Sequence, residues 1–313
     1  MTALTAHRLH FAFSVVYHYL FPQLTMGLGL LIVVLKILAL RGNAFAGEAA
    51  RFWTRIFALG FVMAAAGAFY LLQGKHVDHA KVFLRVGVTA GIIAAVMMAM
   101  PTGDAQARLL AQHQPVTFAA MEGHFHTEDG AGLTLVGQPD VERLRLDNPI
   151  TVPRALSFMT HQRWDARIEG LTSFDRGLWP DNVALLYYSY HVMVGLGTIF
   201  MALLALAAVL LRKGRLFGPR ARPVLWALLL GVPLPFVANT AGWMTAELGR
   251  QPWLVYGVLR TEHGYSANVT AANALFTLLG FMGIYALLSL LFAFVVHRIF
   301  SDGPGPAQAG RAH

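Results

Sequence analysis

The amino-acid sequence predicts an all-α membrane protein, a polytopic bundle of about six hydrophobic helices interrupted by one long polar segment. Of the 313 residues, 56% are hydrophobic and 13% are charged, a composition typical of chains that cross a bilayer several times. Apolar runs long enough to span recur along the chain. The sequence has no cysteine, so disulfides and thiolate metal sites are excluded. A metal or haem iron must therefore be bound by histidine, methionine or carboxylate side chains.

Six segments are each predicted to form one spanning helix. The first begins near Leu9, is longer than a signal-peptide core and has no small-residue cleavage site after it, so we expect it to be retained. The chain then divides into N-terminal membrane helices over 1–100, an extramembrane segment over 101–181, C-terminal membrane helices over 182–300 and a flexible tail over 301–313. The six segments cover residues 9–40, 53–73, 83–100, 183–211, 224–247 and 271–297.

The polar segment over 101–181 contains most of the acidic residues and no run able to span. It is too long for a plain connector, so we expect a functional loop or small domain.

The net charge of +8 comes from basic residues that lie in short clusters between the apolar runs. This pattern indicates membrane orientation rather than nucleic-acid binding. One cluster follows the first run and another follows the fourth, and the positive-inside rule places both in the cytoplasm. Three predicted spans between them would put them on opposite sides, so the topology of residues 53–73 is unsettled. The clusters are Lys36, Arg41, Arg51 and Arg55, and Arg212, Lys213, Arg215, Arg220 and Arg222.

The stretch AGWMTAELGRQPWL places a carboxylate near the end of an apolar run. On a helix, Trp243, Glu247, Arg250 and Leu254 would share one face. A carboxylate at bilayer depth costs roughly 2.5–3.5 kcal/mol, so it normally faces a partner, a cavity or a cofactor. A nearby glycine and proline end the helix about one turn after Glu247. The alternative is an interfacial ion pair that only anchors a helix end.

Two further side chains are candidate ligands. His18 lies ten residues beyond Arg8, about 15 Å along a helix and deep enough to be dry. Neutral imidazole is a common axial haem ligand, and the alternative is a core histidine that is hydrogen-bonded to a neighbouring helix. Met193 alone would be interpreted as packing, because the chain has twelve methionines.

Three long motifs follow one another along the chain: RLHFAFSVVYHYLFPQLTMGLG, YSYHVMVGLG and AGWMTAELGRQPW. Together they resemble subunit I of the cytochrome bd-type quinol oxidases, over residues 4–55 and 62–300. The resemblance implies an enzyme that couples quinol oxidation to reduction of oxygen to water in an aerobic respiratory chain. It also implies a multi-pass protein of the bacterial inner (cytoplasmic) membrane that works with the quinone pool. The implied partners are oxidase subunit II and, as a further candidate, a small single-helix subunit. Nucleic acid is not an expected partner.

The same resemblance implies haem b and haem d as cofactors and assigns ligands to their irons. The position of His18 binds one of two high-spin haems, and Glu247 corresponds to the carboxylate that coordinates the second. Met193 corresponds to an axial ligand of the low-spin haem b that takes electrons from quinol.

Other residues near these ligands are assigned by the resemblance as well. Trp243 and Arg250 line the place of Glu247, the tryptophan as scaffold and the arginine as a propionate or carboxylate partner. His191 stands where other members often have arginine, and either cation would pair with a haem propionate. The candidate catalytic residues are Glu122, Glu247 and Trp243.

The segment HQPVTFAAMEG, residues 113–123, resembles the quinol-binding loop. Quinol oxidation releases two protons with two electrons, so Glu122, expected as a surface carboxylate, is the candidate proton acceptor. Without the motif it would be an ordinary solvated acid. Some members have lysine at the position of Thr117, a departure from the family pattern. Five histidines in polar segments are expected at the surface, and they supply no third metal ligand at a regular spacing: His76, His79, His124, His126 and His161.

An internal block of the family has no counterpart here. Residues 52–58 resemble the start of the second family helix, whereas 62–74 resemble the end of the fifth, so about three crossings are absent at a junction near 59–60. The loss of an odd number of crossings reverses the orientation of every later helix. This agrees with the finding that three predicted spans put the two basic clusters on opposite sides. The absent block contains the histidine that pairs with the Met193 position, acidic residues of the proton path and part of the high-spin pocket.

Two other functions remain alternatives on the sequence alone. One is a non-catalytic, internally deleted remnant that binds a haem or a partner subunit. The other is a transporter in which Glu247 and Arg250 line a path, although no inverted repeat or paired broken helix supports it.

Overall fold

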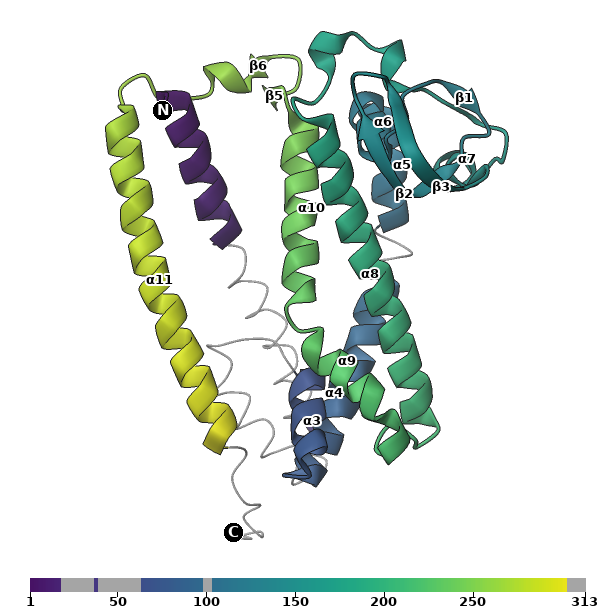
Figure 1. Cartoon of the computed structure of the whole chain (residues 1–313), viewed down its shortest axis with the longest axis vertical. Coiled ribbons are helices and arrows are strands. Elements are labelled where there is room, and N and C mark those ends of the chain that lie inside the picture. Colours follow the sequence, from purple (N-terminus) through teal and green to yellow (C-terminus); the bar gives the residue numbers. More distant parts are fainter. Residues whose placement is uncertain (18–36, 39–62, 98–102, 303–313) are drawn as a thin grey trace. The chain divides into compact units, whose positions relative to one another are not determined.

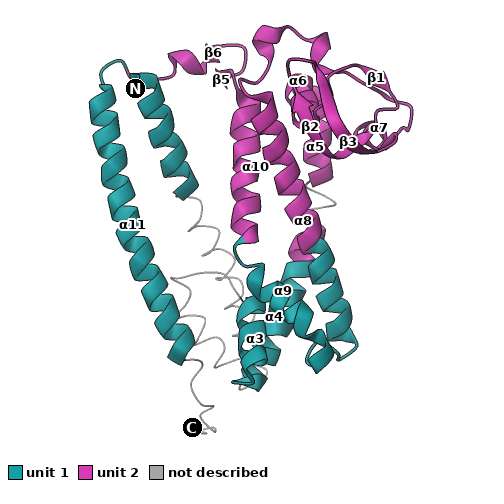
Figure 2. Ribbon diagram, viewed as in Figure 1, with its two compact units in different colours: residues 1–92, 201–233, 267–313 teal, residues 93–200, 234–266 magenta. Residues whose placement is uncertain are grey.

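The computed structural model describes residues 1–17, 37–38, 63–97 and 103–302, and most of these are helical (Figure 1). The described chain falls into two compact units (Figure 2). Unit 1 comprises residues 1–92, 201–233 and 267–313, and unit 2 comprises residues 93–200 and 234–266. His18 and the predicted junction near 59–60 lie outside the described residues.

Unit 1 is built from apolar helices. It contains a helix over residues 3–17, α3 (Met63–Gln73), the first part of α4 (Val77–Met97), the last part of α8 (Val183–Arg212), η4 (Pro219–Ala221), α9 (Arg222–Leu230) and α11 (Ala271–Asp302).

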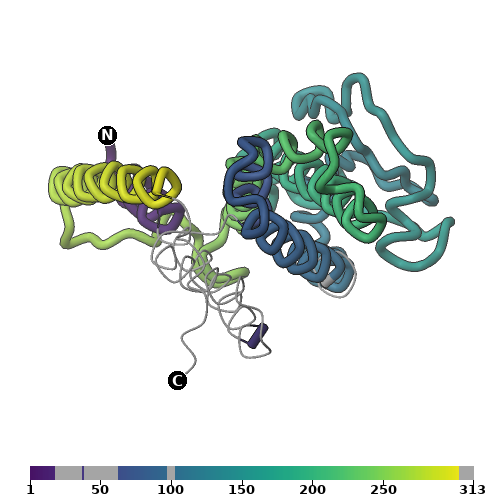
Figure 3. The backbone as a smooth tube through the Cα atoms, turned by 90° about the horizontal axis from the view of Figure 1, so that it is seen from below, coloured from purple at the N-terminus to yellow at the C-terminus, as the bar shows by residue number. Residues whose placement is uncertain are grey.

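Helices α3 and α4 form a closely packed hairpin, and they lie side by side in two views (Figures 1 and 3). A Cβ built on Gly67 would lie 2.8 Å from the backbone nitrogen of Leu84, and one on Gly87 would lie 2.6 Å from that of Ala64. Small residues at such contacts let helix backbones approach within a membrane. The sharp turn between the helices passes through Gly74, whose φ is +68°, a backbone conformation that glycine adopts without cost.

The helix over residues 3–17 packs along α11. The hydroxyl of Tyr17 donates to the carbonyl of Tyr285 at 3.0 Å, and the two rings stack with centroids 3.9 Å apart. Large apolar side chains of α11 are otherwise exposed, for example Phe276 at 81% and Leu290 at 70%. An apolar surface of this extent marks a face for lipid or protein rather than for water.

Three described helices are long and apolar enough to cross a membrane: Val77–Val96, Val183–Arg212 and Ala271–Asp302. A fourth exists if Pro219–Leu230 and Leu234–Arg250 form one bent span. The expectation of a single helix over 224–247 is therefore wrong, because the helix breaks between Leu230 and Leu234. Pro233 and Pro235 cannot donate to the preceding turn, which explains the break. Of the predicted span over 53–73, only the eleven residues of α3 are described.

Unit 2 contains the segment predicted to lie outside the membrane, and this segment is a folded α/β body rather than a plain loop. The all-α expectation holds for the long helices, whereas this body contains short antiparallel strands. β1 pairs with β4 and β2 pairs with β3, with Leu133 opposite Val152 and Asp140 opposite Arg145. Its elements are α5 (Asp104–His113), α6 (Pro115–Glu122), β1 (Glu128–Asp129), β2 (Leu133–Asp140), β3 (Arg145–Val152), α7 (Ala155–His161), β4 (Arg167–Ile168), η2 (Leu171–Ser173) and η3 (Arg176–Leu178).

The remainder of unit 2 consists of the first part of α8, α10 (Leu234–Arg250), β5 (Trp253–Val255), β6 (Leu259–Arg260) and η5 (Thr261–His263). One apolar core joins α6, α7 and the start of α8. Leu171 and Leu186 are fully buried in it, and burying one such side chain stabilises the fold by roughly 1.5–3 kcal/mol.

Candidate functional site

Helix α6 places Glu122 inside unit 2. The helix begins with Pro115 at a position where its missing N–H costs nothing, and it ends at Gly123, whose φ is +66°. Glu122 is 4% exposed, so the expectation of a surface carboxylate is wrong. The cause is the apolar composition of α6, which is buried along almost its whole length and takes its last residue inward with it.

Burial changes the acidity of this carboxyl. Desolvation raises the pKa of Glu122 from 4.5 to about 7, and a hydrogen bond with the side chain of Tyr190 on α8 opposes part of that shift. No residue in the described part of the chain hydrogen-bonds the second carboxylate oxygen, Oε2. A carboxyl with these properties exchanges a proton near neutral pH and keeps one oxygen available to a ligand or a water.

The hydroxyl of Tyr187 is a second buried polar atom that no described residue hydrogen-bonds. The ring lies where a Cβ on Gly123 would be 2.9 Å away, and its hydroxyl oxygen lies 3.0 Å from a Cβ built on Gly137. The two glycines therefore make the space that this tyrosine occupies beside α6.

Helix α6 is also attached to α10. The hydroxyl of Thr117 donates to the carbonyl oxygen of Gly249 at 2.8 Å. Helix α8 in turn meets α10, because a Cβ built on Gly242 would lie 2.7 Å from the Sδ atom of Met193. With the Glu122–Tyr190 hydrogen bond, these contacts connect α6, α8 and α10 pairwise.

The ring of His191 is directed at strand β2. Its Nε2 lies 3.1 Å from the carbonyl oxygen of Thr134, and its Nδ1 lies 2.9 Å from that of Tyr187. The ring also stacks on Tyr187 with centroids 3.9 Å apart. Both nitrogens thus face backbone carbonyls, so the structure uses His191 to attach α8 to β2, and its pairing with a propionate stays a prediction.

Glu247 and Arg250 form the expected pair near the end of α10. Nη1 of Arg250 lies 3.6 Å from Oε1 of Glu247, and the two side chains are 56% and 25% exposed, in that order. Trp243 is half-buried one turn earlier on the same helix. Leu254, by contrast, belongs to strand β5; the expectation that it shares the helical face is wrong, because α10 ends at Arg250.

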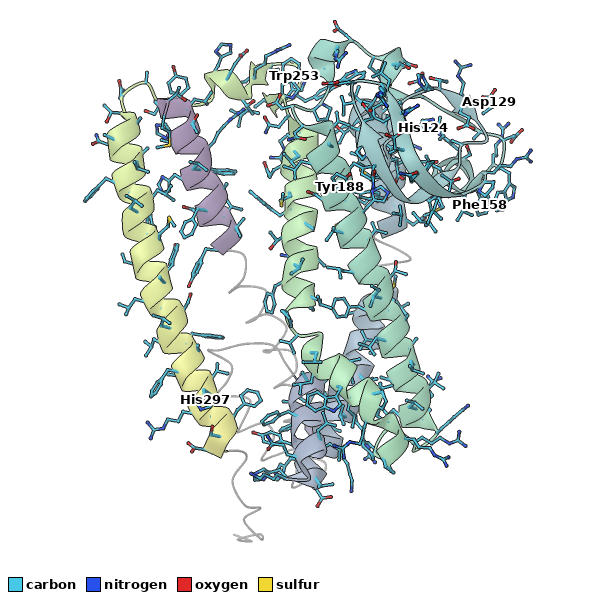
Figure 4. All side chains as sticks on the ribbon, viewed as in Figure 1. His124, Asp129, Phe158, Tyr188, Trp253 and His297 are labelled. Carbon is cyan, nitrogen blue, oxygen red and sulfur yellow. The ribbon has the colours of Figure 1, made fainter. Side chains whose placement is uncertain are left out.

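Two of the five histidines expected at the surface are not fully exposed. His79 lies in the first turn of α4 and is 7% exposed, and its ring lies beside that of the buried Phe83, with centroids 6.4 Å apart. His124 is partly buried within the α/β body (Figure 4). Desolvation lowers the pKa of His124, whose ring hydrogen-bonds the backbone of Ile168. Its Nε2 has no hydrogen-bond partner within the described ranges. His76, His126 and His161 are exposed as expected.

Sequence reasoning did not identify Tyr190 as a partner of Glu122. A signal was present, because Tyr190 and Met193 lie three residues apart in the same motif and therefore on one face of α8. The contacts of Thr117 with Gly249 and of Met193 with Gly242 had no such signal.

The donor atoms in unit 2 fit haem only in part. A carboxylate with an arginine beside it, as at Glu247 and Arg250, suits an iron ligand and a propionate partner. Met193 offers a thioether, but its sulfur packs against Gly242 of α10, a helix without histidine. Within the described residues, no group of three or more histidine or acidic side chains is placed to share one metal ion.

Fold and site together define a helical membrane protein with candidate membrane spans and a buried, titratable carboxyl in unit 2. The family described as cytochrome bd terminal oxidase subunit I matches residues 6–67 and 59–304, and the chain belongs to this family.

Individual relatives agree. Cytochrome bd ubiquinol oxidase subunit 1 of Bacillus subtilis is 31% identical over 252 residues, covering 78% of this chain and 53% of that protein. Cytochrome bd-II ubiquinol oxidase subunit 1 of Escherichia coli is 26% identical over 314 residues, covering 80% and 60%. The structure of bd oxidase from Geobacillus thermodenitrificans superimposes with a TM-score of 0.67 at 28% identity, covering 83% of this chain and 57% of that one. The chain thus spans a little more than half the length of these relatives.

Proposed function

We propose that this chain acts as subunit I of a cytochrome bd-type quinol oxidase in the bacterial inner membrane. In the balanced reaction, two quinols give two quinones, four protons and four electrons, and these reduce one oxygen molecule to two waters. The observation that carries the proposal is the buried Glu122 hydrogen-bonded to Tyr190, which lies three residues before Met193 on α8.

The chain's own residues would divide the work between proton and electron transfer. Glu122, whose pKa is about 7, would accept a quinol proton, because no described residue hydrogen-bonds its Oε2. His18 and Glu247 would bind the high-spin haems, haem b and haem d, and Met193 stands at the position that the family uses for the low-spin haem b. Haem iron supplies one-electron transfer and oxygen reduction when bound. Arg250 and His191 would serve the propionates, with Trp243 as scaffold beside Glu247. Subunit II would complete the enzyme.

A non-catalytic remnant that binds haem or a partner subunit is the second candidate. It is supported by the two family matches, which meet at residues 59–67, as expected if an internal block is absent.

Two measurements on the purified membrane-extracted chain separate these functions. An absorbance spectrum detects bound haem, and an oxygen electrode measures quinol-dependent oxygen consumption. Haem with quinol oxidation supports the oxidase, whereas haem without quinol oxidation supports the remnant. For the site itself, Glu122→Ala should weaken quinol binding; unchanged quinol binding in a folded variant would remove Glu122 from the proposal.

A further inference from the structure

The contact between Thr117 and Gly249 joins two parts of unit 2 that are 132 residues apart in the sequence. Helix α6 has only eight residues, and so short a helix is not stable by itself in water. Its position therefore depends on what it touches. Thr117 lies in the first turn of α6, and Glu122 is the last residue of the same helix.

The acceptor of this bond is one of the carbonyl groups that a helix leaves without an internal partner at its C-terminal end. Near the end of α10, Nε2 of Gln251 donates to the carbonyl of Glu247 at 3.2 Å, and the backbone nitrogen of Gln251 donates to that of Leu248 at 3.1 Å. The carbonyl of Gly249 receives the hydroxyl of Thr117 at 2.8 Å. Thr117, which belongs to α6, therefore supplies the hydrogen bond that the carbonyl of Gly249 lacks within α10.

The fit around this bond is close. A Cβ built on Gly249 would lie 2.6 Å from the Cγ2 methyl of Thr117, while the next side chain, Leu186, would be at an ordinary 3.7 Å. Threonine is branched at Cβ, so its methyl and hydroxyl turn together about χ1. The methyl therefore cannot move away from position 249 without breaking the hydroxyl-to-carbonyl bond.

We propose that Thr117 is a positioning residue that fixes α6, and with it the Glu122 carboxyl, against the end of α10. Position 117 thus contributes by helix placement rather than by contact with quinol. The placement stands on the geometry alone, and its value for quinol oxidation rests on the proposed function.

Four variants of the full chain test the proposal. Thr117→Ser keeps the hydroxyl and removes the methyl, whereas Thr117→Val keeps the shape and removes the hydroxyl. Gly249→Ala introduces the Cβ that meets the methyl, and the double variant Thr117→Ser with Gly249→Ala removes that conflict while keeping the bond. Amide hydrogen exchange over residues 118–122 reports the attachment of α6, with the β2–β3 hairpin as internal reference. An infrared difference spectrum against Glu122→Gln reports the titration of the carboxyl.

We expect exchange over 118–122 to rise about tenfold in Thr117→Val and in Gly249→Ala, the effect of losing one hydrogen bond and leaving a buried carbonyl unpaired. The infrared titration of Glu122 should move toward that of a solvated carboxyl in both. Thr117→Ser should resemble the parent, and the double variant should return to it. Parent-like behaviour of Thr117→Val, or a double variant no better than Gly249→Ala, would overturn the proposal.

A third readout separates this inference from the proposed function. Short-chain ubiquinol should bind Thr117→Val about tenfold more weakly than Thr117→Ser. If the parent binds no ubiquinol, the proposed function fails and the exchange and infrared results alone decide the role of Thr117. If the parent binds it and Thr117→Val binds equally well, the positioning role is wrong.

Discussion

Tyr190 hydrogen-bonds the carboxyl group of Glu122, and both side chains lie in unit 2. The bond joins the end of α6 to the face of α8 on which Met193 follows one turn later. In the proposed function, this hydrogen bond connects the residue that accepts the quinol proton to the helix that contains Met193.

The stability of the fold should depend on pH through Glu122. Burial raises its pKa from 4.5 to about 7, so the folded state favours the protonated form. Its contribution to the free energy of unfolding is fully present below pH 4.5 and is lost as the pH rises through about 7. The loss is about 3 kcal/mol at most. Thermal unfolding of Glu122→Gln should therefore vary less between about pH 5 and about pH 8 than that of the parent.

The exposed Glu142, between β2 and β3, provides the control for this experiment. Glu142→Gln should keep the pH dependence of the parent. Parallel curves for the parent and Glu122→Gln would contradict a buried, titrating Glu122.

Removal of the Tyr190 hydroxyl should make Glu122 a weaker acid. The hydrogen bond from Tyr190 opposes the rise in the pKa of Glu122, so Tyr190→Phe should raise that pKa further. The variant should also lose about 1–2 kcal/mol of stability. Infrared titration of the carboxyl measures the first effect. Tyr188→Phe, at a 45% exposed position of the same helix, should leave the titration unchanged, and equal titrations for the two variants would count against the bond.

The orientation of the chain can be measured at two small residues. Ala44 precedes the predicted span over 53–73 and lies outside the described residues, whereas Gly214 is in the turn after α8. Anionic lipids favour each cytoplasmic basic residue by about 1 kcal/mol, so both basic clusters should lie on the same side. Cysteines placed at the two positions should both be labelled from the cytoplasm. Labelling from opposite sides would show that hydrophobicity overrules charge.

Local patterns in the sequence predict the helix ends better than they predict burial. The position of Glu247 near the end of α10 follows from Gly249 and Pro252 alone. The burial of Glu122 cannot be predicted in this way. It depends on the contact of Thr117 in α6 with Gly249 in α10, 132 residues later, and on Tyr190 of α8. Pro233 and Pro235 indicate the break before Leu234, but the apolar residues on both sides of them have the pattern of one continuous span.

A six-coordinate low-spin haem is not expected in this chain. Such a haem needs a histidine and a methionine on facing helices, both at bond distance from the iron. Met193 packs its sulfur at Gly242 of α10, a helix that contains no histidine. His191 lies two residues from Met193, points to another side of α8 and has both ring nitrogens at carbonyl oxygens.

His18, which lies outside the described residues, is assigned by the family resemblance to a high-spin haem, so it does not supply the missing ligand of Met193. A missing low-spin haem would favour the non-catalytic remnant, because electrons from quinol would then lack their entry point even if haem were bound at His18 or Glu247. A reduced-minus-oxidised spectrum should therefore lack a sharp low-spin b-type band, and Met193→Ala should leave the spectrum unchanged. Met201→Ala, a partly exposed position on the same helix at 36%, is the matched control. A sharp band that disappears in Met193→Ala and persists in Met201→Ala would show that a partner histidine exists, and its helix would then have to face α8 at Met193.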